Sequence, residues 1–143
     1  METSEFITID NAKKTNEWQS AYCVIARETI DGRVVMRKSL REEYLDNGDL
    51  RDMLRKEYAL GSLLAEHTPY VVGYRRMTDD ARECSIVMDY VEGETVDVFI
   101  STHPDFFRNE SNLRKFLGQL LEGLEEIHNS QVVHMDIKPS NVM

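Results

Sequence analysis

The chain is poor in the features that mark membrane, secreted and zinc-binding proteins. It has no apolar run near the roughly 18 residues that span a bilayer, and its N-terminus, M-E-T-S-E-F, lacks a signal-peptide pattern. Its two cysteines, Cys23 and Cys84, have no C-x-x-C spacing, and no His/Cys cluster has metal-ligand spacing. A disulfide is possible, but two buried thiols in a cytoplasmic protein fit the pattern better.

Positive charge is also scarce. The 143 residues include 17 Lys and Arg against 26 Asp and Glu, which gives a net charge of −9. A nucleic-acid backbone requires a basic surface, and so does an anionic membrane. Neither is therefore an expected partner. The hydrophobic fraction of 41% indicates a globular protein, and the length suffices for one domain with a core.

Glycine is absent before Gly32, where it forms part of an Asp-Gly pair. That pair separates two β-type runs, 21–27 and 33–40, and predicts a hairpin. Further strands are expected at 6–9, 70–77 and 83–91, with a turn at 78–80, while residues 11–20 are polar and predict a loop.

Helical spacing of apolar residues predicts a helix over 50–65, which Thr68-Pro69 should end. A short helix capped by Thr95 should end near Ser101. A longer one, with Ser111 as N-cap, should run through 113–127 with a continuous apolar stripe. The order of elements predicts an α+β fold: a small antiparallel sheet with one inserted helix, followed by a helical region.

The strongest chemical signal is the string H-M-D-I-K-P-S-N, residues 134–141. The Asp136 carboxylate can accept a hydroxyl proton, Lys138 can neutralise a phosphoryl group, and the Asn141 amide oxygen can hold a divalent metal. Composition alone would favour an ordinary polar turn. The ordered string, however, resembles the catalytic loop of protein kinases, H-R-D-x-K-x-x-N.

The resemblance to protein kinases implies further residues upstream. Lys38, in V-M-R-K, matches the strand lysine that holds the nucleotide phosphates, and Glu57, 19 residues later, matches its helical partner. A carboxylate among apolar residues requires a cation, although a rim glutamate facing water is the usual alternative. Arg37 is a competing cation, but strand alternation places it on the face opposite Lys38. We expect a Lys38–Glu57 ion pair.

The segment I-V-M-D-Y-V-E-G, residues 86–93, resembles the fifth strand and hinge of the family. By that match Met88 lies at the back of the adenine pocket, and the backbone from Asp89 to Val91 offers hydrogen bonds to the adenine. A buried strand leaving a sheet is the alternative interpretation.

The sequence departs from the kinase pattern at two places. If Val24 is the valine of G-x-G-x-x-G-x-V, the glycine positions fall on Glu17, Gln19 and Tyr22. Phosphate cradling by that loop is then in doubt. Met135 also replaces the arginine that in the family reads a phosphorylated activation loop.

The resemblance implies a kinase-like N-lobe over 1–91 and a hinge with an incomplete C-lobe over 92–143. The expected function is that of a serine/threonine protein kinase, using ATP and Mg²⁺ on a protein substrate in its complete form. The D-F-G motif would follow Met143, so we expect this chain to be truncated and inactive alone. A non-catalytic kinase-like binding module and a small-molecule phosphotransferase are the alternatives. The apolar 113–127 helix predicts self-association or a second polypeptide as partner.

Overall fold

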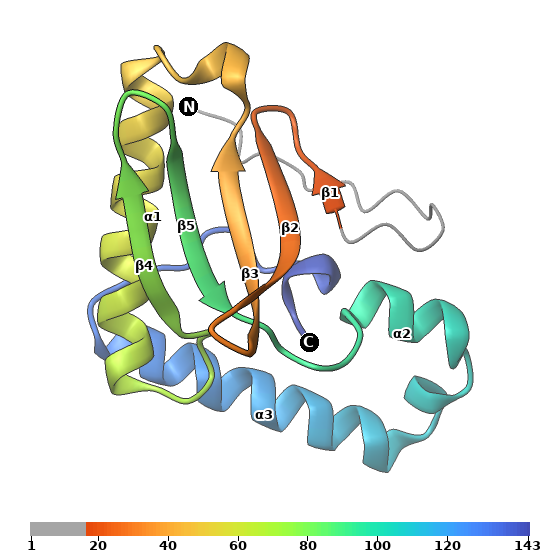
Figure 1. Cartoon of the computed structure of the whole chain (residues 1–143). Helices are drawn as coiled ribbons and strands as arrows, with labels where there is room; N and C mark the ends of the chain where they lie inside the picture. The colour runs from red at the N-terminus through yellow and green to blue at the C-terminus, as the bar shows by residue number, and fades with distance from the viewer. Residues whose placement is uncertain (1–16) are drawn as a thin grey trace. The chain divides into compact units, whose positions relative to one another are not determined.

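The computed structural model describes residues 17–143, with side chains from Ser20 onward, so the strand expected at 6–9 lies outside the described residues. The described residues divide into two compact units: residues 17–66 with 72–90, and residues 67–71 with 91–143. The described elements, in chain order, are β1 (Glu17–Gln19), β2 (Cys23–Ile30), β3 (Arg33–Leu40), η1 (Glu42–Tyr44), α1 (Gly48–His67), β4 (Tyr74–Asp79), β5 (Cys84–Asp89), α2 (Val96–Thr102), η2 (Phe106–Arg108), α3 (Glu110–Asn129) and η3 (Pro139–Asn141) (Figure 1).

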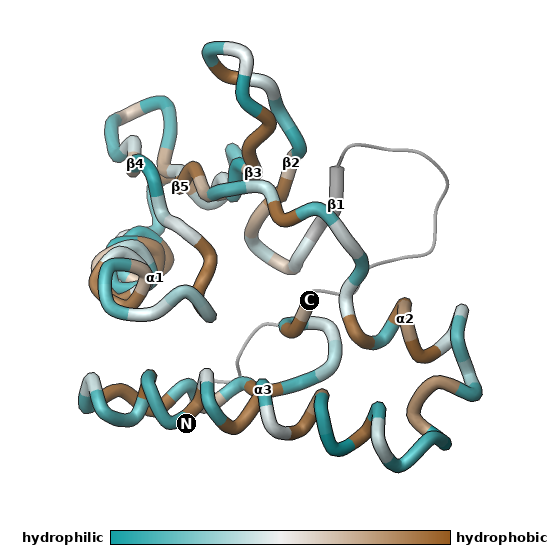
Figure 2. Tube along the Cα trace, turned by 90° about the horizontal axis from the view of Figure 1, so that it is seen from below, coloured by the Kyte–Doolittle hydropathy of each residue, from teal (hydrophilic) through white to brown (hydrophobic). Residues whose placement is uncertain are grey.

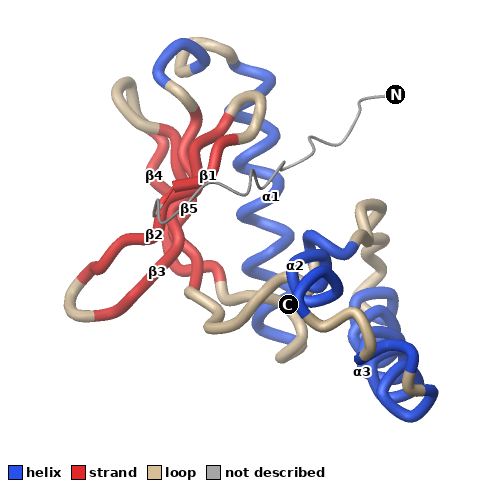
Figure 3. The backbone as a smooth tube through the Cα atoms, turned by 90° about the vertical axis from the view of Figure 1, so that its right-hand side faces the viewer, coloured by secondary structure: helices blue, strands red, loops and turns tan. Residues whose placement is uncertain are grey.

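The first unit is an antiparallel five-stranded sheet in the order β1-β2-β3-β5-β4 with α1 along one face (Figure 3). The β2–β3 hairpin turns at Asp31 and Gly32, both with positive φ, of 50° and 75°. Two residues with positive φ form the turn that matches the twist of a hairpin, so the Asp-Gly prediction is confirmed. The expected α+β class is also confirmed.

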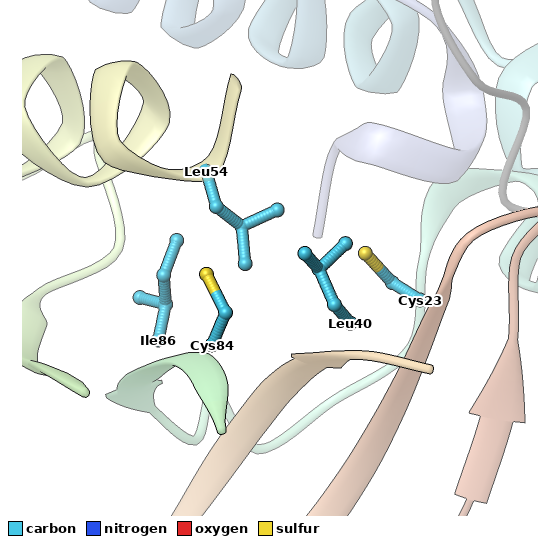
Figure 4. Close-up of a cluster of buried hydrophobic side chains, with 5 residues drawn as sticks. All are labelled: Cys23, Leu40, Leu54, Cys84 and Ile86. Atoms are coloured by element: carbon cyan, nitrogen blue, oxygen red, sulfur yellow. The ribbon is translucent and has the colours of Figure 1, made fainter. Parts of the chain in front are cut away.

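The core of this unit lies between α1 and the sheet. Its buried side chains are those of Cys23, Leu40, Leu54, Cys84 and Ile86. Figure 4 shows Leu54 of α1 pointing at the other four, which come from the sheet. Both cysteines are buried thiols, as expected, and burial raises the pKa of the Cys84 thiol.

Two strand predictions need correction. Residues 17–19 form β1 instead of a loop, and the strand expected from residue 70 begins only at Tyr74. Tyr70 instead belongs to the second unit. There its hydroxyl donates to Glu122 Oε2 of α3 at 2.8 Å, and a Cβ added to Gly123 would lie 3.2 Å from the Tyr70 Cβ. The ring therefore rests on a position of α3 that has no side chain.

Two further boundaries differ from expectation. The residues from Thr78 to Asp79 still belong to β4, so the turn to β5 follows Asp79. The helix α1 is longer than expected but ends at His67, directly before Thr68-Pro69, as predicted.

The second unit contains α2, η2 and α3, and its helix caps also differ from the predictions. The N-cap of α3 is Asn109, whose side chain accepts from the amides of Ser111 and Asn112, so the assignment of Ser111 was wrong. Thr95 is the N-cap residue of α2, but its hydroxyl makes no capping hydrogen bond.

Candidate functional site

Lys38 and Glu57 form the ion pair that the sequence predicts. Lys38 lies in the middle of the sheet, opposite Ile25 of β2 and Ile86 of β5. Its Nζ lies 2.7 Å from Glu57 Oε2, and the two side chains are 16% and 30% exposed. Partial burial reduces solvent screening, so this pair is stronger than a fully exposed one.

The position of Glu57 follows from the packing of α1. Leu54 and Leu64 on the same helix are buried, and Gly61 lies against the ring of Tyr74, where an added Cβ would be 2.3 Å from Cε2. Burial and the nearby charge of Glu57 raise the pKa of the Tyr74 phenol well above its usual range.

Arg37 points to the other face of the sheet. Its Nε donates to Glu28 Oε2 at 2.9 Å, and its Nη1 donates to Glu83 Oε1 at 2.7 Å and to Ser85 Oγ at 3.2 Å. Burial lowers the pKa of Arg37, but the two carboxylates outweigh that effect and raise it overall. Strand alternation thus decides which cation meets Glu57, as expected.

The end of β5 has its own pairing. Met88 lies opposite Met36 of β3 and packs against the core. The Asp89 carboxylate accepts from Arg75 Nε at 2.6 Å and from Arg75 Nη2 at 2.8 Å. The Asp89 amide donates to the Gly73 carbonyl at 2.8 Å. The side chain of Asp89 is therefore engaged by Arg75, and its N–H is engaged by Gly73.

In the second unit, two predicted residues, Lys138 and Asn141, converge on the carboxylate of a third, Asp136. Lys138 Nζ lies 3.1 Å from Asp136 Oδ2. The Asn141 amide nitrogen donates to that same oxygen at 2.9 Å and to the Asp136 carbonyl at 3.0 Å. Because Nδ2 donates to Asp136, the hydrogen bonds of this side chain to Asp136 do not use the amide oxygen. Val91 also lies in this unit and is exposed.

The backbone around Asp136 turns sharply to allow this convergence. Met135 has a φ of 60°, in the left-handed region that costs a residue with a Cβ about 1 kcal/mol or more. Its side chain is 88% exposed. The Asp136 amide donates to His134 Nδ1 at 3.2 Å, and the Val96 amide donates to the Val142 carbonyl at 2.8 Å. These bonds hold the segment on both sides of Asp136.

The oxygens of the loop bear on whether it can hold a magnesium ion. Among residues 17–143, no three His, Cys, Asp or Glu side chains gather into a metal-binding group. Magnesium in phosphoryl-transfer sites takes one or two protein oxygens and completes its shell with water and substrate phosphates. The Asn141 amide oxygen is of that kind, so the loop fits a metal that arrives with a nucleotide.

Several contacts were missed from the sequence. The Asp89–Arg75 pair joins neighbouring strands at an irregular register, which no local pattern reveals. The role of His134 as an acceptor depends on the left-handed Met135. The pairing of Asn141 with Asp136 could be anticipated only from their spacing across Pro139, which begins η3.

Comparison with known proteins agrees with this geometry. Residues 17–143 match the family profile of the protein kinase domain. The chain is 32% identical over 127 residues to the serine/threonine-protein kinases PknA of Corynebacterium glutamicum, covering 83% of this chain and 26% of that protein. It is 31% identical over 140 residues to Wee1-like protein kinase 2 of Homo sapiens, covering 96% of this chain and 24% of that protein. It is 29% identical over 119 residues to the serine/threonine-protein kinase PrkC of Bacillus subtilis, covering 83% of this chain and 18% of that protein.

The chain belongs to the protein kinase superfamily. It spans about a quarter of the length of the first curated relatives it matches. Within the described part of the chain, each helix is too short or too polar to cross a lipid bilayer.

Proposed function

We propose that this chain forms the nucleotide-binding lobe and catalytic loop of a serine/threonine protein kinase, which in its complete form transfers the γ-phosphate of ATP to a protein hydroxyl. The observation that carries the proposal is the convergence of Lys138 Nζ and Asn141 Nδ2 on Asp136 Oδ2. A loop with one carboxylate, one ammonium and one amide at these distances suits phosphoryl transfer, which depends on positioning and charge neutralisation.

Each residue of the loop has a distinct part in this proposal. Asp136 orients the substrate hydroxyl and accepts its proton. Lys138 offsets the negative charge of the phosphoryl group during transfer, and Asn141 holds Asp136 in position while its amide oxygen contributes to a metal site. Bound Mg²⁺ would neutralise charge on the nucleotide phosphates.

The sheet unit supplies the nucleotide contacts in the proposal. Lys38 donates to the phosphates, and Glu57, 2.7 Å away, fixes the orientation of the ammonium group. Met88 borders the adenine, and the Asp89 carbonyl and the backbone of Val91 bond its edge. In this proposal the N-lobe covers residues 1–91, the hinge and incomplete C-lobe cover 92–143, and the protein acts in the cytoplasm.

A non-catalytic, kinase-like binding module is the second candidate. It is favoured by one observation, the turn between β1 and β2, where the Ser20 side chain fills hydrogen-bonding positions that a phosphate-binding loop leaves for its ligand. Such a module would bind protein partners without transferring phosphate.

The test is Asp136→Asn in a form of the protein that includes the rest of the kinase domain. We expect loss of radiolabel transfer from ATP to protein, with the dissociation constant for ATP unchanged within about twofold, because an amide keeps the shape but cannot take the proton. Asp97→Asn, at an exposed position of α2, is the control. Transfer by the Asp136 variant at the parental rate would remove Asp136 from this role. An inactive parent that still binds ATP would favour the non-catalytic candidate.

A further inference from the structure

Ser20, the first residue of the turn between β1 and β2, closes that turn with its own hydrogen bonds. Ser20 Oγ accepts from the Cys23 amide at 2.9 Å and donates to the Cys23 carbonyl at 3.2 Å. The Ser20 amide donates to the same carbonyl at 2.8 Å. Ser20 is only 6% exposed, so these bonds are sheltered from water and define one turn conformation.

A second set of contacts ties this turn to the segment after β3. Arg41 Nη2 donates to the Ser20 carbonyl at 2.7 Å, and the Arg41 amide donates to the Tyr22 carbonyl at 2.9 Å. The rings of Tyr22 and Tyr44 meet edge to face, with centroids 5.2 Å apart. The turn is therefore fixed both by its own bonds and by residues 41–44.

This arrangement differs physically from a glycine loop. A glycine-rich loop is mobile when empty and directs backbone N–H groups at phosphates, so that ligand binding pays the cost of ordering it. Here the N–H groups of Ser20 and Cys23 already have acceptors inside the turn. The turn has side chains where glycines would allow the backbone to approach a phosphate.

We propose that Ser20 and Arg41 lock the β1–β2 turn before any nucleotide binds, so that it acts as a fixed cover and not as a loop that closes on the phosphates of a nucleoside triphosphate. Ser20 and Arg41 are positioning residues in this proposal. The effect of the lock on nucleotide binding rests on the proposed function, whereas the lock itself is a property of the free chain.

The first experiment measures amide hydrogen exchange by NMR in the nucleotide-free chain. The Cys23 amide should exchange slowly in the parent. In Ser20→Ala it should exchange roughly fivefold faster or more, the factor expected for one lost hydrogen bond, and Arg41→Ala should have a similar effect. Ser20→Thr, which keeps the hydroxyl, should restore slow exchange. Ser101→Ala, which removes an exposed hydroxyl from α2, should leave the Cys23 rate unchanged.

The second experiment adds ATP with Mg²⁺, and separately ADP with Mg²⁺, to the same samples. In the parent, exchange of the Cys23 amide should change by less than about twofold with either nucleotide. In Ser20→Ala it should slow toward the parental rate, because the ligand must now order the turn. Affinity for ATP should fall by about fivefold in that variant, reflecting the ordering of roughly one residue.

The outcomes separate the lock from the proposed function. Fast Cys23 exchange in the free parent that becomes slow only with ATP would overturn the lock, and so would equal rates in the parent and Ser20→Ala. If neither nucleotide binds any variant, the proposed nucleotide site fails. The lock is then decided by the exchange rates of the free chain alone.

Discussion

At the scale of single residues, Asp79 shows how one carboxylate joins two elements. It lies at the end of β4 and pairs with Arg51 and Arg55 of α1, with Arg55 Nε 2.6 Å from Asp79 Oδ2. Hydrogen bonds from Arg55 and, to a smaller extent, from Arg51 lower the pKa of the Asp79 carboxyl. Together they outweigh desolvation, which acts in the opposite direction. The pairing stabilises the folded state only while Asp79 is ionised.

Asp79→Asn should therefore destabilise the chain in a pH-dependent way. A lowered folded-state pKa adds stability that is fully present above the unfolded value of about 3.9 and is lost as the pH falls through the folded value. We expect a loss of about 1 kcal/mol near pH 7, the upper range for exposed ion pairs, and a smaller loss as the pH falls below about 3.9.

Urea unfolding of Asp79→Asn and the parent from pH 7 to pH 3 measures the difference in their free energies of unfolding at each pH. Asp46→Asn, at an exposed position that precedes α1, serves as the control and should change little at any pH. An Asp79→Asn effect that stays constant down to pH 3 would show that the charge of Asp79 is not the stabilising feature.

Lys38 and Glu57 could be paired through the resemblance to protein kinases. Strand alternation favoured Lys38 over Arg37, and helical spacing placed Glu57 on the apolar face of its helix. Asp89 could not be paired with Arg75, because the register of β4 against β5 shifts between Tyr74 and Arg76. The cap of α3 was misplaced because Asn109 and Ser111 are both good cap residues.

At the scale of elements, the packing of α1 on the sheet depends on a small residue. Gly61 faces the Tyr74 ring, and that ring meets Tyr58 edge to face with centroids 6.3 Å apart. The ring has a packed neighbour and cannot retreat without cost. The spacing that places Gly61 in the apolar stripe was visible in the sequence, but the need for glycine there was not.

Gly61→Ala should destabilise the chain even though alanine is the better helix former. Alanine gains about 1 kcal/mol in helix propensity, whereas overpacking costs roughly 1–3 kcal/mol, so we expect a net loss of about 1 kcal/mol in the free energy of unfolding. Gly118→Ala in α3 is the matched control, because an added Cβ there meets nothing within 4 Å. It should stabilise the chain. Equal stabilisation by both substitutions would mean that Tyr74 moves aside freely.

The helix α3 shows the limit of periodicity. The expected stripe, 113–127, lies on α3, where hydrophobic and hydrophilic residues alternate along the helix (Figure 2). Only part of the stripe is covered. Ile127 is buried, whereas Leu113, Leu117 and Leu121 are 38%, 44% and 64% exposed. Periodicity identifies an apolar face but not what packs on it.

At the scale of the whole molecule, the exposed part of α3 bears on how the chain behaves in solution. We expect the purified chain to self-associate, because contiguous exposed apolar side chains drive association. The double variant Leu117→Gln/Leu121→Gln should lower the apparent mass in light scattering toward that of a monomer. Leu60→Gln, at an exposed leucine of α1, is the control and should not. A monodisperse parent at high concentration would contradict this expectation.

The division into two compact units also explains which structural features could be predicted from the sequence. Sheet and helix types, the hairpin and the catalytic loop follow from local patterns. The docking of Tyr70 on α3 does not, because the segment 67–71 leaves the sheet unit between α1 and β4. The sequence around Tyr70 has strand propensity, and a long-range contact overrides it.

Calorimetric titration of this chain with ATP and Mg²⁺, comparing Lys38→Met with Arg37→Met, tests most directly whether Lys38 binds the nucleotide phosphates. We expect the parent to bind ATP weakly. Lys38→Met should weaken it by about tenfold or more, as expected for loss of a charged hydrogen bond. Arg37→Met, at the adjacent residue on the opposite face, should leave the affinity within about twofold. No ATP binding, or equal losses in the two variants, would contradict the assignment of Lys38 and Glu57 as the phosphate-binding pair.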